Sequence, residues 1–145
     1  MFQIDNIMST ELITVHPSAS LYHARELMNE KRIRHLPVVN DEGLLVGLLT
    51  QTDVLAASDS ILKDRDSQLE TAFFPVEDAM VTDLDTVSPA ASLRQAAIFL
   101  ERHKIGCLPV VEGNKLVGIV TDTDFVGVAI NLLEQLEEFE PESEG

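Results

Sequence analysis

Two short segments of the sequence place a hydroxyl group and a carboxylate at a spacing suited to ligand binding. They run from Gly47 to Asp53 and from Gly118 to Asp124, and both read Gly, two apolar residues, Thr, any residue, Thr, Asp. In both, an apolar strand leads into the start of a helix, whose free N–H groups and nearby hydroxyl can bind an anion. An aspartate one helical turn further on can accept hydrogen bonds from two neighbouring ribose hydroxyls. The pattern therefore suits a nucleotide, with its phosphate at the threonine and its ribose at the aspartate.

The same residues also have a structural interpretation. Thr50 with Asp53, and Thr121 with Asp124, match the capping box, in which a threonine and an acidic residue three positions later satisfy each other's backbone N–H groups at a helix start. Capping alone explains either segment. The binding interpretation adds to capping without replacing it, so both stay open at this point.

The two segments belong to an internal repeat that covers most of the chain. At an offset of 72 residues, 15 of the 32 positions from Met8 to Val39 carry the same residue as their counterparts. After a gap of one residue the offset becomes 71, and residues 45–47 match residues 116–118. A repeat of this length indicates that one structural unit occurs twice.

Each copy is predicted to contain the elements β-α-β-β-α. The strands and helices expected in the first copy are, in order, Leu12–Val15, Leu21–Lys31, Leu36–Val39, Leu44–Leu49 and Thr50–Ala57. Ser18 or Ser20 can cap the first helix, and a turn with a glycine joins the last two strands. The second copy repeats this order from Asp85 to about Leu136.

Composition and charge fit a globular protein of ordinary domain size. The 145 residues are 45% apolar and 24% charged, which excludes a disordered or collagen-like chain. The net charge of −15 argues against nucleic acid or an anionic membrane as a partner, because both require a basic surface. One cysteine cannot form an internal disulfide, and the N-terminal residues lack the pattern of a secretory signal. We therefore expect a soluble, cytoplasmic protein.

The repeat divides the chain into four parts. We expect the first repeat at residues 1–57, a linker at 58–75, the second repeat at 76–136 and an acidic disordered tail at 137–145. Asp59, Asp64 and Asp66 in the linker could suggest a metal site. A solvated linker is the better interpretation of such a run of charges.

The duplicated pattern resembles the CBS domain family, in which two copies form one CBS pair, or Bateman module. The resemblance rests on the two Gly-to-Asp segments and on the strand motifs His35–Val39 and Cys107–Val111, in the same order in both copies. It covers about Ile7–Leu55 and Val76–Ile130. The compact chain and the run Asp124–Asn131 are similar to stand-alone CBS proteins of the acetoin-utilisation type. The resemblance implies a mixed α/β (α+β) fold whose two repeats pack as a pseudo-two-fold pair.

In this family, adenosine ligands such as AMP, ADP, ATP or S-adenosylmethionine lie in clefts between the repeats, and the resemblance implies the same here. One repeat supplies the adenine pocket, and the other supplies the threonine and the ribose-binding aspartate. The residues implied for the first cleft are Thr14, Ala19, Ile33, Arg34, His35, Ile119, Thr121 and Asp124. Those implied for the second cleft are Thr86, Ala91, Ile105, Gly106, Cys107, Leu48, Thr50 and Asp53.

The positions of the basic residues favour the first cleft. Lys31, Arg32, Arg102 and Lys104 lie near two predicted helix C-termini, where cations complement the helix dipole. Arg34 lies beyond its helix and beside the first cleft. It can supply the local positive charge that a phosphate needs on so acidic a chain, because salt screens the distant charges.

Other kinds of chemistry have little support in the sequence. Cys107 stands between apolar neighbours and is more simply a buried strand residue than a nucleophile. The four histidines lack a metal-ligand spacing, and the chain has no phosphate-binding loop and no paired acid and base. We therefore expect neither catalysis nor a metal site, and no required cofactor.

The sequence thus predicts a regulatory module that senses an adenine nucleotide or S-adenosylmethionine. The alternative is a constitutive dimerisation or protein-interaction module with empty clefts. The duplicated threonine and aspartate favour sensing, because an interaction module has no need of two ribose-binding acids. The resemblance also implies an unidentified regulated protein and a homodimer in which two pairs form a flat disc. Apolar faces at Leu21–Met28 and Ala96–Leu100 are consistent with that dimer, although core packing explains them equally well.

Overall fold

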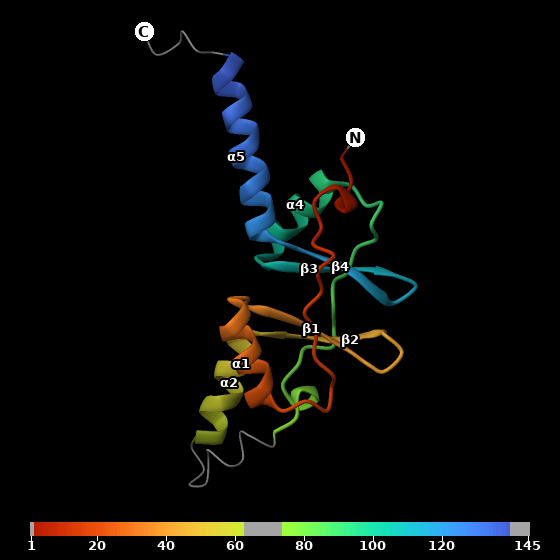
Figure 1. Ribbon diagram of the computed structural model, residues 1–145, viewed down its shortest axis with the longest axis vertical. Helices are drawn as coiled ribbons and strands as arrows, with labels where there is room; N and C mark the ends of the chain where they lie inside the picture. Colours follow the sequence, from red (N-terminus) through yellow and green to blue (C-terminus); the bar gives the residue numbers. More distant parts are fainter. Residues whose placement is uncertain (1, 63–73, 140–145) are drawn as a thin grey trace.

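A computed structural model of the chain describes residues 2–62 and 74–139, with residues 59–62 described by their backbone alone. The first repeat contains α1 (Leu21–Lys31), β1 (His35–Val39), β2 (Leu45–Thr50) and α2 (Gln51–Leu62). The second contains α4 (Leu93–His103), β3 (Cys107–Glu112), β4 (Lys115–Thr121) and α5 (Asp122–Phe139). Two short 3-10 helices precede the repeats, η1 (Ile4–Asn6) and η2 (Val76–Asp78). The expected mixed α+β fold with two copies of one unit is confirmed (Figure 1).

Each repeat is built around an antiparallel hairpin. β1 pairs with β2 so that His35 lies opposite Thr50, and β3 pairs with β4 so that Cys107 lies opposite Thr121. Figure 1 shows the two hairpins one above the other, with α1 and α2 beside the lower one and α4 and α5 beside the upper one. The register therefore puts the start of α2 and the start of α5 next to the first residue of the opposite strand.

The first helix of each repeat has a matching start. Ser20 caps α1 and accepts a hydrogen bond from the backbone N–H of His23 at 3.0 Å, which decides between the two serines considered above. Ser92 caps α4 in the same way through Gln95. Such a cap satisfies one of the N–H groups that a helix start leaves without a partner.

The apolar faces of α1 and α4 are used inside their own repeats. Leu21, Ala24 and Met28 are buried in the first core, and Ala96 and Leu100 are buried in the second. Core packing therefore accounts for these two faces. They do not form a free surface for a second copy of the chain.

The two repeats exchange their leading segments. Ile4 of η1 is 0% exposed and lies in the core of the second repeat, where its N–H donates to Ala91 O at 3.0 Å. Val76 of η2 is also 0% exposed, but it lies in the core of the first repeat, and its N–H donates to Ala19 O at 2.8 Å. Each core is thus completed by a residue that precedes the other repeat in the sequence. No pattern in the sequence predicts this exchange.

The exchange explains why the first predicted strand of each copy is wrong in length. Only Val15, of the expected strand Leu12–Val15, pairs with β1, as a single parallel bridge to Val38. Ser9 instead pairs with Ile119 of β4 in the other repeat. The residues between must cross from one repeat to the other, so they cannot run along β1. Val87 forms the matching single bridge in the second copy.

Two helices continue past the expected ends of their repeats, residues 57 and 136. α2 continues to Leu62, so residues 58–62 of the expected linker are helical. α5 continues to Phe139, so residues 137–139 of the expected disordered tail are helical. The rest of the tail, 140–145, and Asp64 and Asp66 of the linker lie outside the described residues. Across the ranges that are described, no helix is both long and apolar enough to cross a membrane.

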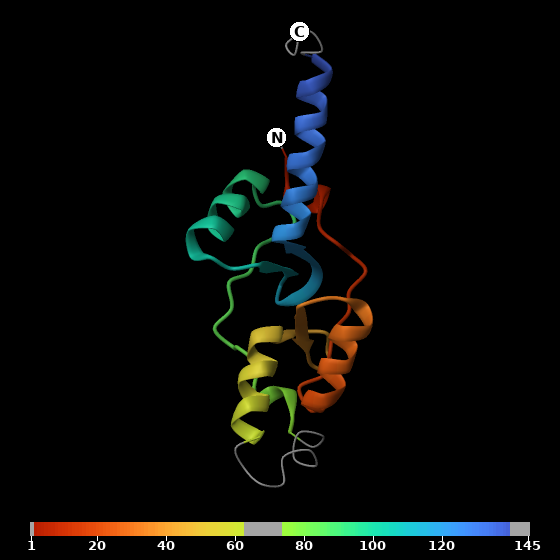
Figure 2. The ribbon, with the colours of Figure 1, turned by 90° about the vertical axis from the view of Figure 1, so that its left-hand side faces the viewer.

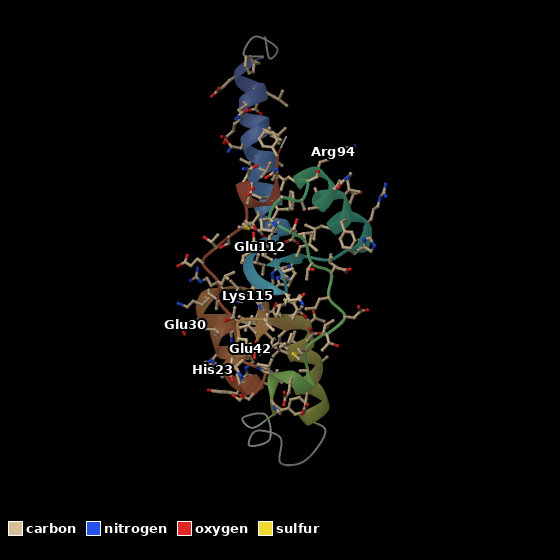
Figure 3. The ribbon with its side chains drawn as sticks, turned by 90° about the vertical axis from the view of Figure 1, so that its right-hand side faces the viewer. His23, Glu30, Glu42, Arg94, Glu112 and Lys115 are labelled. Carbon is tan, nitrogen blue, oxygen red and sulfur yellow. The ribbon has the colours of Figure 1, made fainter. Side chains whose placement is uncertain are left out.

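The hairpin turns of the two repeats meet. The N–H of Leu45 donates to Asn114 O at 2.9 Å, and Leu44 forms a bridge with Lys115. Figure 3 labels Glu42 and Lys115, which mark the two turns at this contact. Together with the exchanged segments, the turns fix how one repeat sits on the other.

The histidine that begins β1 lies against the second repeat. A Cβ added to Gly106 would lie 3.2 Å from Nε2 of His35, so the imidazole packs on the glycine backbone. Burial lowers the pKa of His35, the Asp122 carboxylate opposes this shift, and the Arg34 guanidinium adds to it. The pairing of a ring with a glycine is specific to this half of the molecule, because the repeat places Cys107 where His35 stands and Arg34 where Gly106 stands.

Replacement of Gly118 tests the exchange. A Cβ at this position would lie 2.6 Å from Sδ of Met8 and 3.2 Å from the carbonyl oxygen of Ser9. We expect Gly118→Ala to lower the free energy of unfolding by about 1–3 kcal/mol through overpacking, measured by urea denaturation. Gly127→Ala is the control, because a Cβ there meets nothing within 4 Å and alanine favours the helix. Equal destabilisation by both changes would contradict the exchanged position of Met8.

The lowered pKa of His35 predicts a pH dependence of stability. Since the unfolded chain binds a proton at this histidine more readily than the folded chain, the free energy of unfolding falls as the pH drops below about 6.5. Above that pH both states are neutral at this ring and the full stability remains. We expect His35→Gln to show a shallower loss of stability on acidification in urea titrations. Identical pH dependence in both proteins would argue against burial of the imidazole.

Candidate functional site

The two repeats enclose a cleft of about 380 Å³. The first repeat contributes the crossing segment and the residues between α1 and β1, and the second contributes the end of β4 and the start of α5. The lining residues are Ser9, Glu11, Leu12, Ile13, Arg32, Ile33, Arg34, His35, Pro37, Ile119, Thr121, Asp122, Thr123 and Asp124. One of the two Gly-to-Asp segments therefore faces the basic turn of the opposite repeat.

Most of the residues implied for the first cleft are brought together here. Six of the eight line the cleft, namely Ile33, Arg34, His35, Ile119, Thr121 and Asp124. Thr14 and Ala19 do not line it. Ala19 packs against the first core and accepts the hydrogen bond from Val76, so the exchanged segment covers it.

The capping interpretation of the Thr and Asp pair is confirmed in both repeats. The N–H of Thr121 donates to Oδ2 of Asp124 at 2.8 Å, and the N–H of Asp124 donates to Oγ1 of Thr121 at 3.4 Å. Thr50 and Asp53 form the same pair at 2.9 and 3.1 Å. In Asp124 the capping bonds use Oδ2, so Oδ1 can accept a hydrogen bond from a ligand in the cleft. Capping and ligand binding are therefore compatible in one side chain.

The residues implied for the second cleft do not line one common hollow among those described here, unlike most of the residues implied for the first cleft. Ile105 and Gly106 line a groove of about 470 Å³ between α4 and α5. Thr50 lines a smaller hollow of about 200 Å³ that also contains Gly106, Arg34 and His35. The other five residues line neither of these hollows nor the cleft described above. They are Thr86, Ala91, Cys107, Leu48 and Asp53. The residues implied for the second cleft are thus divided among these hollows and other parts of the described structure.

Several lining residues were missed by sequence reasoning. Asp122 and Thr123 lie inside the recognised motif, and their place in the first turn of α5 was the available signal. Arg32 was assigned to the helix dipole, yet it has a left-handed backbone conformation with φ 56° and lines the cleft. Ser9 and Glu11 reach the cleft through the exchange of segments, for which the sequence held no signal.

The cleft contains charges of both signs. Arg32 and Arg34 contribute guanidinium groups, and Glu11, Asp122 and Asp124 contribute carboxylates. The cations lie on the first repeat with Glu11, and the two aspartates lie on the second. A ligand that carries an anionic group and neutral hydroxyls can therefore direct the anion toward the arginines and the hydroxyls toward Asp124.

The other candidates for chemistry are the cysteine thiol and any cluster of metal-binding side chains. Cys107 is 5% exposed, and burial, reinforced by Asp122 and Asp124, raises the pKa of its thiol to about 12. The thiol is therefore protonated at neutral pH, and the thiolate is the nucleophile. Among the side chains described, those of residues 2–58 and 74–139, no three of His, Cys, Asp or Glu gather as a metal site.

Comparison with known sequences gives one family. The model of the CBS domain matches residues 4–60 and 76–131. A CBS domain-containing protein, YhcV of Bacillus subtilis, is 35% identical over 120 residues, which cover 83% of this chain and 80% of that protein. A homoserine O-acetyltransferase of Methanococcoides burtonii is 34% identical over 122 residues, but these make up only 23% of that enzyme.

Comparison with solved structures agrees. A putative acetoin utilization protein, AcuB of Vibrio cholerae, has a TM-score of 0.83 and 42% identity, with 95% of this chain and 97% of that chain covered. CBSX2 in complex with AMP has a TM-score of 0.78 and 32% identity, with 91% and 98% covered. The CBS domain pair of MJ0100, in complex with 5-methylthioadenosine and S-adenosyl-L-methionine, has a TM-score of 0.75 and 26% identity, with 90% and 98% covered. With both repeats matched in sequence and in fold, the chain belongs to the CBS domain family and consists of one CBS pair.

Proposed function

We propose that this protein is a regulatory module that senses an adenosine-containing ligand, namely AMP, ADP, ATP or S-adenosylmethionine. The observation that carries the proposal is the cleft between the repeats, where Arg34 of one repeat faces Thr121 and Asp124 of the other. Related CBS pairs in complex with AMP and with S-adenosyl-L-methionine support the class of ligand. The module needs no cofactor and catalyses no reaction.

Each part of the ligand has a matching part of the cleft. The ribose hydroxyls donate to Asp124, whose carboxylate is held in place by its capping bonds to Thr121. The phosphate lies near the N-terminus of α5 and the guanidinium of Arg34, since both attract anions. The adenine ring packs against apolar side chains such as Ile33 and Ile119.

A ligand in this position links the two repeats. It contacts the turn before β1 in one repeat and the start of α5 in the other, so binding stabilises one relative arrangement of the repeats. A partner protein that prefers this arrangement is then favoured by the ligand. In this proposal the protein is a cytoplasmic homodimer. The ligand-stabilised arrangement is recognised by a regulated protein that is not identified.

One observation favours the second candidate, a constitutive interaction module. The C-terminal half of α5 exposes large apolar side chains, and Leu136 and Phe139 are 62% and 84% exposed. An interaction surface and a ligand cleft can exist in one protein. Ligand binding in the cleft distinguishes a sensing module from a constitutive interaction module.

A thermal shift measurement tests ligand sensing. An adenine nucleotide at about 100 times its dissociation constant, bound only to the folded state, adds about 2.7 kcal/mol of stability. At about 2–4 °C per kcal/mol for a chain of this size, the melting temperature should rise by about 5–11 °C. No shift with AMP, ADP, ATP and S-adenosylmethionine, and no ligand released from the denatured purified protein, would leave the interaction module as the function.

Two aspartates form a matched pair for locating the site. Asp124→Ala and Asp53→Ala each remove a capping box, so both should lower the basal stability by about 0.5–2 kcal/mol. Only Asp124 lines the cleft. We therefore expect the ligand-induced rise in melting temperature to be lost in Asp124→Ala and kept in Asp53→Ala. The reverse result would place the ligand in the second set of residues.

The role of Arg34 can be separated from binding of the nucleoside. Arg34→Ala should weaken AMP about tenfold or more, the effect of losing one charge-assisted hydrogen bond to a phosphate, and leave adenosine affinity unchanged in calorimetric titrations. Arg94→Ala on α4 removes the same charge from an exposed position away from the cleft (Figure 3) and should change neither affinity. Equal weakening of AMP and adenosine by Arg34→Ala would show that the guanidinium does not contact the phosphate.

A further inference from the structure

The imidazole of His35 belongs to two hollows at the boundary between the repeats. It lines the cleft of about 380 Å³ and the smaller hollow of about 200 Å³, and Arg34 and Asp122 also line both. The rest of the smaller hollow comes from Gly106 and from residues 50–52, at the start of α2. Figure 2 shows the starts of α2 and α5 at this boundary, with the two helices running away from it in opposite directions. The ring is therefore part of the wall that the cleft and the hollow share.

The ring of His35 is positioned by packing and not by hydrogen bonds. A Cβ on Gly106 would lie 3.2 Å from Nε2 and 3.3 Å from Cε1, so the glycine allows the imidazole to pack closely. In the described part of the chain, ring nitrogens of His16 and His103 form hydrogen bonds at 2.7 and 3.0 Å, whereas those of His35 form none. A ring that is held in place with its nitrogens unpaired can donate to a ligand in the cleft.

Charges of both signs face this ring from the elements around it. They are Arg32 and Arg34 from the turn before β1, Glu11 from the crossing segment, and Asp122 and Asp124 from the start of α5. The start of α2 adds only uncharged residues, and the thiol of Cys107 on β3 is protonated at neutral pH. Burial lowers the pKa of His35, Asp122 opposes this shift, and Arg34 adds to it. The ring is therefore mainly neutral at pH 7 when no anion lies beside it.

A phosphate in the cleft would change this balance. It carries about two negative charges at neutral pH, and an opposite charge within about 4–6 Å favours the protonated form of an imidazole. We infer that His35 is a specificity residue of the cleft, whose imidazole takes up a proton when the phosphate of a ligand binds beside Arg34. The inference rests on the proposed function. It adds that adenosine ligands with a phosphate are favoured over adenosine itself, and more strongly as the pH falls.

The direction of this pH dependence follows from linkage. Because the complex binds the proton more readily than the free protein, the affinity for AMP rises as the pH falls through the pKa of His35 in the complex. The rise ends below the pKa of His35 in the free protein, where both forms are protonated. Each unit by which AMP raises this pKa makes the protonated protein bind AMP about tenfold more tightly than the neutral protein. Adenosine brings no anion and should show little of this dependence.

NMR titration of the histidine rings tests the proton uptake. The full chain is titrated from about pH 8 to about pH 5.5, across the ordinary range of histidine, alone and with saturating AMP or adenosine. His35→Gln assigns the signals of His35. We expect AMP to raise the pKa of His35 by about one unit or more and adenosine to leave it nearly unchanged. His23 is the internal reference, because it is exposed on α1 and does not line the cleft (Figure 3). An unchanged pKa of His35 in the AMP complex, or an equal rise with adenosine, would overturn the inference.

Calorimetric titration with AMP tests the effect on affinity. Between about pH 7.5 and about pH 6.5, the ratio of the two affinities should be about threefold larger in the native protein than in His35→Gln. The phosphate of AMP also titrates, with a pKa of about 6, but it does so equally in both proteins and cancels in this comparison. His23→Gln is the matched control and should keep the native ratio. Equal ratios in the native protein and His35→Gln would overturn the inference alone. Failure of AMP to bind the native protein at either pH would overturn the proposed function as well, so the two failures are distinguished.

Discussion

The structure depends on an exchange of buried residues between the repeats. Ile4 and Val76 are both fully buried, each in the core that belongs to the other copy of the repeat. Pulling the repeats apart would expose both side chains and break the backbone pairs Ser9–Ile119 and Leu48–Val81. Because burying one such aliphatic side chain contributes about 1.5–3 kcal/mol, neither repeat is complete on its own. The cleft follows from the same exchange, since the crossing segment that begins at Ser9 forms one of its walls.

The two halves of the molecule are unequal because of a few substitutions within the repeat. Where the first copy has Arg34 and His35, the second has Gly106 and Cys107. The imidazole of His35 occupies the space that the missing side chain of Gly106 leaves, and it lies beside Asp122. Arg32 and Arg34 of the first repeat line the cleft, whereas Lys104 of the second repeat lines the groove between α4 and α5. Two copies with the same backbone pattern can thus differ in the side chains that they place at the boundary between the repeats.

Much of the fold could be predicted from the sequence because its signals are local. The bounds of α1 follow from a serine cap and helical spacing, and the capping boxes follow from four residues each. The exchange of segments could not be predicted, because Ile4 and Val76 are apolar residues that fit either core equally well. Six residues that line the cleft were implied by the resemblance to the CBS family. Glu11 lines it because the chain crosses between the repeats, and Arg32 has a left-handed backbone conformation that is uncommon for a residue other than glycine.

The helix α5 connects the cleft with an exposed apolar surface. Its first turn carries Asp122 and Asp124 in the cleft, and its exposed half carries the apolar face. A continuous α-helix transmits a rotation of its first turn to its far end, because its backbone hydrogen bonds resist bending. A ligand that shifts the start of α5 relative to β1 would therefore move these exposed apolar side chains as well. The free energy of such coupling is limited by the difference in ligand affinity between the two arrangements of the repeats. By linkage, a partner that prefers one arrangement would alter the ligand affinity by the same factor.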